Sequence, residues 1–212
     1  MILHAAVLSP DKRHNDPARR RLVSRQTALQ KILYISNVKT SSYPEFWPQF
    51  YTATINKWKH LLNNNECKEI IIDSLRFLVK EKRVVMYSFV IMSNHIHIIW
   101  QALSGHTPSA IQSSFMKYTS HQILEYLQKT NHELLESLIV NKGDRNYQVW
   151  KREALSIELR SSAVFNQKLD YIHNNPLRAG LCLQNEAYFY SSAKFYNGGE
   201  DVFKILTHYL DS

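Results

Sequence analysis

The most restrictive stretch of the sequence is residues 84–100, which read VVMYSFVIMSNHIHIIW. β-Branched and aromatic side chains dominate it, and it is interrupted at Ser93-Asn94, so we expect two strands joined there. Residues two apart on a strand point to the same face. His95 and His97 should therefore lie side by side, a spacing that lets two imidazoles bind one metal ion.

A second motif lies far downstream, where residues 169–181 read LDYIHNNPLRAGL. Tyr171 and Asn175 are four positions apart, so on a short helix they share one face. Two imidazoles, one amide oxygen and one phenol suggest metal-assisted attack by a tyrosine on a phosphate. A phenol has a pKa of about 10 and needs help to react at neutral pH, and a divalent metal can stabilise the charge that develops on the phosphate.

The chain resembles the single-tyrosine transposases of the HUH type, and within them the REP-associated tyrosine transposases and their transposase-like relatives. The motifs that carry the resemblance are YSFVIMSNHIHIIWQ (Tyr87–Gln101), DYIHNNPLRAGL (Asp170–Leu181) and YFYSSAKFY (Tyr188–Tyr196). It extends from about Phe46 to Tyr196.

The resemblance implies that His95 and His97 bind the metal, that Tyr171 is the nucleophile and that Asn175 is a third ligand. Some single-tyrosine enzymes use glutamine where Asn175 stands, which shortens the ligand arm by one methylene here. The resemblance also implies Mg²⁺ or Mn²⁺ as cofactor, although imidazole ligands suit Mn²⁺ better than Mg²⁺.

The activity implied by the resemblance is DNA transposition, by cleavage and strand transfer of single-stranded DNA through a 5'-phosphotyrosine intermediate. Hairpin structure in the DNA is part of what the resemblance implies. One tyrosine gives one covalent intermediate per active site, so moving an element with two ends points to a homodimer, with a monomer as the alternative. Lys117 and Arg178 are candidates for contacts with DNA phosphates.

The formal charge of the 212 residues is +8, with a pI near 9.4, which favours a polyanionic partner. Residues 1–31 hold seven basic and two acidic side chains and so contribute +5 of this charge. Residues 1–45 lack a sustained hydrophobic period, and we expect a basic, disordered arm there. An overextended reading frame is the alternative, and the transposase-like domain is expected over residues 46–212.

Two cysteines form no disulfide framework and no zinc ligand set, which favours a reducing cytoplasm. No apolar run approaches the length needed to span a bilayer, and the first ten residues lack the features of a signal peptide. We therefore expect a soluble cytoplasmic protein without membrane contact.

The hydrophobic periodicity predicts the order strand–helix–strand–strand–helix–strand–helix, which is typical of a ferredoxin-like α+β domain with an antiparallel sheet. Strands are expected in residues 49–55, around the histidines and within residues 147–159, where the sequence reads YQVWKREALSIEL. Helices are expected over residues 65–82 and 108–129, the second with Thr107 as N-cap. The last helix should begin at Ser161 or Ser162 and end near Asn175, because the following proline disfavours helical geometry there.

Two other functions are compatible with the same residues. A domesticated relative could hold DNA hairpins without cutting them, although a pure binding protein would not require Tyr171. An unrelated histidine metallohydrolase would use water, but the sequence offers no evident acidic ligand or general base beside His95 and His97. His173 is two positions from Tyr171, on another helix face, and is expected to be structural.

Overall fold

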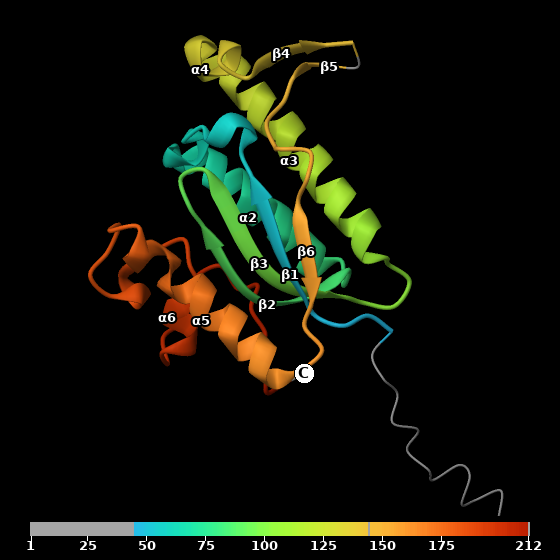
Figure 1. The fold of residues 1–212 in the computed structure, drawn as a ribbon, viewed down its shortest axis with the longest axis vertical. Helices are drawn as coiled ribbons and strands as arrows, with labels where there is room; N and C mark the ends of the chain where they lie inside the picture. The colour runs from blue at the N-terminus through green and yellow to red at the C-terminus, as the bar shows by residue number, and fades with distance from the viewer. Residues whose placement is uncertain (1–44, 144, 212) are drawn as a thin grey trace, which may run out of the picture. The chain divides into compact units, whose positions relative to one another are not determined.

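The computed structural model describes residues 45–143 and 145–211 (Figure 1). The expected N-terminal arm, residues 1–45, lies outside this part of the chain except for its last residue. Of the described helices, none is long and apolar enough to cross a membrane.

A four-stranded antiparallel sheet organises the described chain, with the strand order β2-β3-β1-β6. The strands are β1 (Gln49–Thr54), β2 (Val84–Ile91), β3 (His95–Ala102) and β6 (Leu155–Glu158). With one helix after β1 and another after β3, this order is the ferredoxin-like α+β arrangement predicted from the sequence. The strand pair around the histidines is also confirmed, with the connection at residues 92–94.

Helices α2 (Asn65–Lys80) and α3 (Pro108–Thr130) pack on one face of the sheet. Each begins at a side-chain cap: the Asn64 carboxamide accepts from two backbone N–H groups, and the Thr107 hydroxyl accepts from the N–H of Ala110. Their apolar stripes form the larger core with alternate residues of the strands, among them Tyr51, Ile96, Ile98 and Trp100. Both helices confirm the sequence-based expectation, Thr107 included.

Helix α5 (Ser162–Arg178) packs on the opposite face, as Figure 1 shows. It begins as expected, with the Ser161 hydroxyl accepting from the N–H of Val164. A second, smaller core forms beneath it; its buried residues are Phe50, Tyr87, Val90, Met92, Ile99, Leu159, Phe165, Leu169 and Ile172. Because side chains alternate along a strand, Phe50 faces α5 while its neighbour Tyr51 faces α2 and α3.

The expected end of α5 near Asn175 is wrong, because the helix continues to Arg178 with Pro176 inside it. Proline removes one backbone donor, yet here it lies in the last turn, and burial of its ring favours the continued helix. The backbone carbonyls of Asn175 and Leu177 accept from the N–H of Ala179, which closes the helix. Asn175 is therefore an intrahelical residue and not the point where the helix ends.

The strand expected within residues 147–159 is also shorter than predicted, since β6 covers only its last part. Val149 and Trp150 instead bury their side chains in the larger core, and Trp150 pairs with Ile55 only as an isolated bridge. A short helix, α4 (His132–Glu136), and a hairpin of β4 (Ile139–Lys142) and β5 (Arg145–Tyr147) separate α3 from this segment.

The remaining described elements are short. Two 3₁₀ turns, η2 (Asn56–Trp58) and η3 (Leu61–Asn63), connect β1 to α2, and η4 (Asn185–Ala187) and α6 (Ala193–Tyr196) follow α5. Ser191, within the YFYSSAKFY motif, forms a bridge with Val90 of β2, so the segment after α5 is attached to the outer strand of the sheet.

Candidate active site

The structure brings together four of the residues singled out in the sequence, two on β3 and two on α5. The ring centroids of His95 and His97 are 4.8 Å apart, and those of His97 and Tyr171 are 5.1 Å apart. The side chain of Asn175 lies close enough to His95 to raise the pKa of its imidazole. The site therefore lies where α5 crosses the sheet, on the face that carries the smaller core.

Each imidazole is oriented through its Nδ1 atom. His95 Nδ1 is 2.7 Å from Asn94 Oδ1, and His97 Nδ1 is 2.7 Å from Thr52 Oγ1 on β1. A carbonyl oxygen only accepts hydrogen bonds, so His95 donates from Nδ1 and keeps a lone pair on Nε2. The Thr52 hydroxyl can accept from His97 in the same way, which makes the same tautomer available there.

Both imidazoles are held neutral. Burial lowers the pKa of His97 to about 3. The charge of Lys168, and the charge that His95 carries when it is protonated, act in the same direction. Burial also lowers the pKa of His95, an effect that Asn175 opposes because its side chain can accept a hydrogen bond from the protonated ring. A neutral imidazole is the form that binds metal, so at neutral pH no proton competes with a cation for these nitrogens.

The donor set fits a divalent cation. His97 Nε2 is buried and has no hydrogen-bond partner among the described residues, a costly arrangement for a polar atom unless another group satisfies it. His95 stands beside it. The Asn175 side chain lies next to His95, so its carbonyl oxygen is available as a third donor to a cation. Within the described chain, no group of three His, Cys, Asp or Glu side chains could hold a metal. A cation bound here would have two imidazoles and the Asn175 amide as its protein ligands.

Tyr171 stands at the open side of this arrangement, with 36% of its surface exposed. The Phe50 ring meets it edge-on at 5.9 Å, and Phe50 also stacks on His97 at 5.4 Å. Phe50 thus supports the nucleophile candidate and a metal-ligand candidate at once. The phenol is exposed enough to meet a large substrate, yet its ring has a fixed neighbour on the sheet.

Two cations flank Tyr171 along α5. Lys168 Nζ lies 5.9 Å from the Tyr171 ring centroid and 4.9 Å from that of Phe50, and Arg178 Cζ lies 5.8 Å from the Tyr171 centroid. Neither forms an ion pair with a described carboxylate. The surroundings of the phenol therefore favour a negatively charged substrate.

Four residues of the site were not identified from the sequence: Phe50, Thr52, Asn94 and Lys168. Phe50 and Thr52 share a face of β1, which period-2 alternation indicates, but nothing local shows that this face meets the histidines. Lys168 lies three residues before Tyr171, a spacing that places the two side chains on neighbouring positions of a helix. This three-residue spacing was the feature of the sequence that could have identified Lys168 as a neighbour of Tyr171.

His173 is structural, as expected from its position on another face of α5. It is buried, its Nε2 is 2.9 Å from Ser192 Oγ, and Ser192 Oγ is 2.8 Å from Ser88 Oγ on β2. A β-bulge between Met86 and Ser88 gives β2 one extra residue at this point. The YFYSSAKFY motif thereby helps to fix α5, and with it Tyr171, against the sheet.

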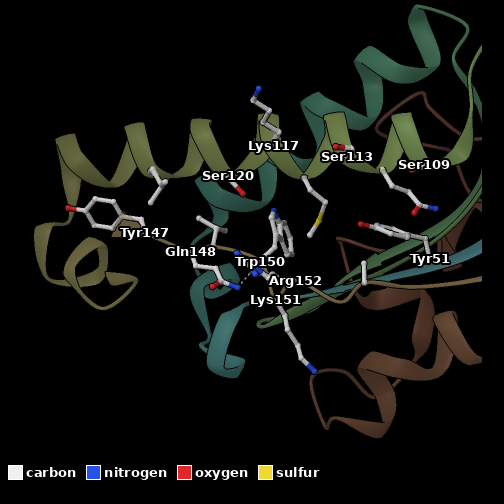
Figure 2. A pocket seen from close by; sticks show the side chains of 15 residues that line it. Tyr51, Ser109, Ser113, Lys117, Ser120, Tyr147, Gln148, Trp150, Lys151 and Arg152 are labelled. Atoms are coloured by element: carbon white, nitrogen blue, oxygen red, sulfur yellow. Dashed lines mark hydrogen bonds between the residues drawn. The ribbon is translucent and has the colours of Figure 1, made fainter. Parts of the chain in front are cut away.

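The two residues expected to contact DNA lie in different places. Arg178 is beside Tyr171, whereas Lys117 lines a separate pocket formed by α3 and residues 147–154, shown in Figure 2. Tyr51 also lines this pocket, on the face of the sheet away from Tyr171. The contact with DNA itself stays a prediction for both side chains.

Comparisons with known proteins give a fold but no family by sequence. No family model matches the chain. No curated protein matches it either. Among solved structures, a REP-associated tyrosine transposase bound to a REP hairpin is 17% identical, with a TM-score of 0.53, over 82% of this chain and 91% of that one. A protein from Deinococcus radiodurans assigned as a transposase is 13% identical, with a TM-score of 0.42, over 64% of this chain and 95% of that one.

The likeness to the hairpin-bound transposase establishes that this chain has the fold of a REP-associated tyrosine transposase. The resemblance seen in the three sequence motifs is thus confirmed at the level of the fold.

Proposed function

We propose that this protein is a DNA strand transferase that cleaves single-stranded DNA through Tyr171, as a transposase does. The observation that carries the proposal is one arrangement: a partly exposed tyrosine beside two neutral imidazoles and an amide, flanked by two cations that form no ion pair with a described carboxylate. The fold of a REP-associated tyrosine transposase supports it.

In the proposed reaction, the Tyr171 oxygen forms a bond to the phosphorus of a phosphodiester while the bond to the 3' oxygen breaks. The phenol proton passes to solvent, and the departing 3' oxygen takes up a proton to become a hydroxyl. The phosphate then remains on Tyr171 as a 5'-phosphotyrosine, which conserves the energy of the broken bond for rejoining to another strand.

His95, His97 and Asn175 would hold a divalent cation, Mg²⁺ or Mn²⁺, with Mn²⁺ suiting the imidazoles better. When bound, the cation supplies Lewis-acid stabilisation of negative charge on the scissile phosphate. Thr52 and Asn94 orient the imidazoles through their Nδ1 atoms. Lys168 and Arg178 attract the phosphate from either side of the phenol.

The proposed substrate is single-stranded DNA that carries a hairpin, by analogy with the REP hairpin bound to the solved transposase. A homodimer is the proposed assembly, since joining two ends of an element needs two tyrosines when each site has one. A domesticated protein that binds hairpins without cutting them would have the same fold, and the following experiment separates it from the enzyme.

The test uses labelled hairpin oligonucleotides with single-stranded extensions, incubated with the purified protein and Mn²⁺ and resolved on a denaturing gel. We expect a covalent protein–DNA adduct with the wild type and none with Tyr171→Phe. Tyr118→Phe is the matched control, because Tyr118 is 51% exposed on α3 and outside the site. An adduct that persists in Tyr171→Phe would refute the assignment, and hairpin binding without adducts in the wild type would favour the binding protein.

A further inference from the structure

A second surface with properties suited to DNA lies on the other face of the sheet. It is a hollow of about 540 Å³ between α3 and the segment from Tyr147 to Ala154 (Figure 2). Nothing in the proposed chemistry of Tyr171 uses it. Its size is within the range of sites that bind ligands of moderate size.

The sequence of α3 explains why the helix presents polar groups to this hollow. Its buried residues recur every four positions and fill the larger core; they are Ile111, Phe115, Thr119, Ile123 and Leu127. A neighbouring row lines the hollow and carries three hydroxyls and an ammonium; it consists of Ser109, Ser113, Lys117 and Ser120. From Ser109 to Ser120 the row rises about 16 Å along the helix.

The charged residues at the hollow are all basic. Lys117 stands on the α3 side, and Lys151 and Arg152 stand on the opposite side, with Lys117 and Lys151 extending in opposite directions in Figure 2. Of the described residues that line the hollow, none is acidic. Flexible four-carbon stems allow the two lysine ammonium groups to turn toward an anion that lies between them.

The buried hydroxyl of Tyr51 independently indicates that the hollow binds a ligand. Tyr51 is 0% exposed, its hydroxyl has no hydrogen-bond partner among the described residues, and it lines the hollow. Burial raises the pKa of Tyr51, so the hydroxyl remains a donor. A buried donor without an acceptor is unfavourable until an acceptor arrives. Met116, an adaptable unbranched side chain, lines the same hollow and can shift to admit one.

We propose that this hollow binds the phosphodiester backbone of the DNA strand on which Tyr171 acts, a proposal that rests on the proposed function. Hydroxyl and ammonium donors, with no carboxylate among the described residues that line the hollow, match a ligand that only accepts hydrogen bonds. Phosphate is such a ligand. Free phosphate shares that chemistry. The DNA strand is the better match, because the cations stand on both sides and the donor row is long enough to follow several phosphates.

The position of the hollow is compatible with a single strand that reaches both surfaces. Phe50 and Thr52 of β1 face the Tyr171 site, while Tyr51 between them faces the hollow. The strand β6, at the edge of the sheet, pairs with β1 and is mostly exposed. DNA that crosses this edge meets the nucleophile on one face and the donor row on the other.

The test measures binding of a fluorescent hairpin oligonucleotide by anisotropy at several salt concentrations, in a Tyr171→Phe background that prevents covalent capture. We expect Lys117→Ala and Lys151→Ala each to weaken binding about 3- to 10-fold at about 0.1 M salt and to reduce the salt slope by about 0.7–0.9. The matched control is Lys129→Ala, on the same helix but outside the hollow and paired with Glu125. Equal affinities for these variants and the control would overturn the proposal.

Tyr51→Phe provides a second measurement that does not depend on charge. Since the hydroxyl has no hydrogen-bond partner among the described residues, its removal should leave the melting temperature unchanged or raised. We expect hairpin affinity to fall several-fold all the same, and an unchanged affinity would remove Tyr51 from the proposed contact.

A titration with inorganic phosphate, followed by NMR, tests whether the hollow binds free phosphate in place of a DNA strand. If Lys117→Ala abolishes the binding of inorganic phosphate but leaves the hairpin affinity unchanged, the hollow binds free phosphate and the proposal of a DNA strand is wrong. Failure of the proposed function would look different, because the wild type would then bind no hairpin or form no adduct. Hairpin binding with adducts, but without an effect of the Lys117 and Lys151 changes, refutes the hollow alone.

Discussion

Thr52 and His97 lie directly opposite each other on β1 and β3, and their side chains are joined by a hydrogen bond of 2.7 Å between Oγ1 and Nδ1. The register of the sheet therefore sets the orientation of the buried imidazole. A slip of one residue would turn the Thr52 hydroxyl to the other face of the sheet. The partner that orients His97 is thus 45 residues away in sequence and fixed only by strand pairing.

Thr52→Val should weaken the proposed metal site without removing a ligand. Valine keeps the β-branched shape that suits a strand but cannot hydrogen-bond Nδ1, so the imidazole loses its orienting partner. We expect the Mn²⁺ concentration for half-maximal cleavage to rise about tenfold, at the low end of the usual effect of such outer partners. A titration of adduct yield against Mn²⁺ measures this.

Thr54→Val is the matched control, since Thr54 lies on the same strand and has no side-chain hydrogen bond within the described chain. Its titration curve should coincide with that of the wild type. If both variants shift the curve equally, the effect belongs to strand packing, and the role assigned to the Thr52 hydroxyl is wrong.

His95→Ala and His97→Ala should each abolish metal-dependent adduct formation, and the double variant should be little worse than either single one. Groups that act as one unit show this non-additivity. The measurement is the initial rate of adduct formation at saturating Mn²⁺ for the four proteins of the cycle. Rates near wild type in chelator-treated buffer for either single variant would show that the imidazoles serve packing alone.

The placement of the residues within each pair was predictable, because it depends on a local period. His95 and His97 follow the twofold repeat of a strand, and Tyr171 and Asn175 the turn of a helix. The meeting of the two pairs came from the family resemblance. Spacing alone does not specify which helix crosses which strand.

The missed features depend on tertiary structure. Thr52 became part of the site through the register of β1 against β3, which the sequence of β1 alone does not specify. The end of α5 was misjudged because Pro176 disfavours a helix locally, whereas burial of its ring against the rest of the protein outweighs that preference. In the same way, Trp150 adopts the conformation that buries its ring in the larger core instead of extending β6.

Lys168→Met should slow cleavage by about 10- to 100-fold while weakening DNA binding far less. Its ammonium lies over the rings of Tyr171 and Phe50, with no ion pair to a described carboxylate, so it can stabilise charge that develops on the phosphate. Methionine keeps the apolar contact with Phe50. Single-turnover adduct formation at saturating DNA measures the rate, and Lys168→Arg should restore part of it because the charge returns.

Gln167→Met controls for the introduction of methionine on the exposed part of α5, next to the tested position. Its rate should equal that of the wild type. A Lys168→Met rate equal to this control, with weaker binding, would make Lys168 a DNA-binding residue without a role at the reacting phosphate.

Asn175 allows the sharpest separation of a ligand from a residue that only supports the helix. Its side chain lies next to His95 and raises the pKa of that imidazole, while α5 continues past Asn175 and closes at Ala179 through backbone groups. The side-chain amide of Asn175 therefore does not cap the helix. Asn175→Ala should raise the Mn²⁺ concentration for half-maximal cleavage by about tenfold or more, as loss of a coordinating oxygen would. Asn175→Gln should recover part of the effect, since it restores an amide on a longer arm.

The matched control is Asn174→Ala, whose side chain donates to the backbone carbonyl of Asp170 on the same helix. Removing that bond should cost about 1 kcal/mol of stability or less and leave the metal titration in place. All the titrations are run well below the melting temperatures of the variants, so that unfolding does not contribute. If the curve of Asn175→Ala coincides with that of Asn174→Ala, while both proteins melt lower than wild type, Asn175 stabilises the fold and is not a metal ligand. The metal would then be bound by His95 and His97 with ligands from the DNA and water.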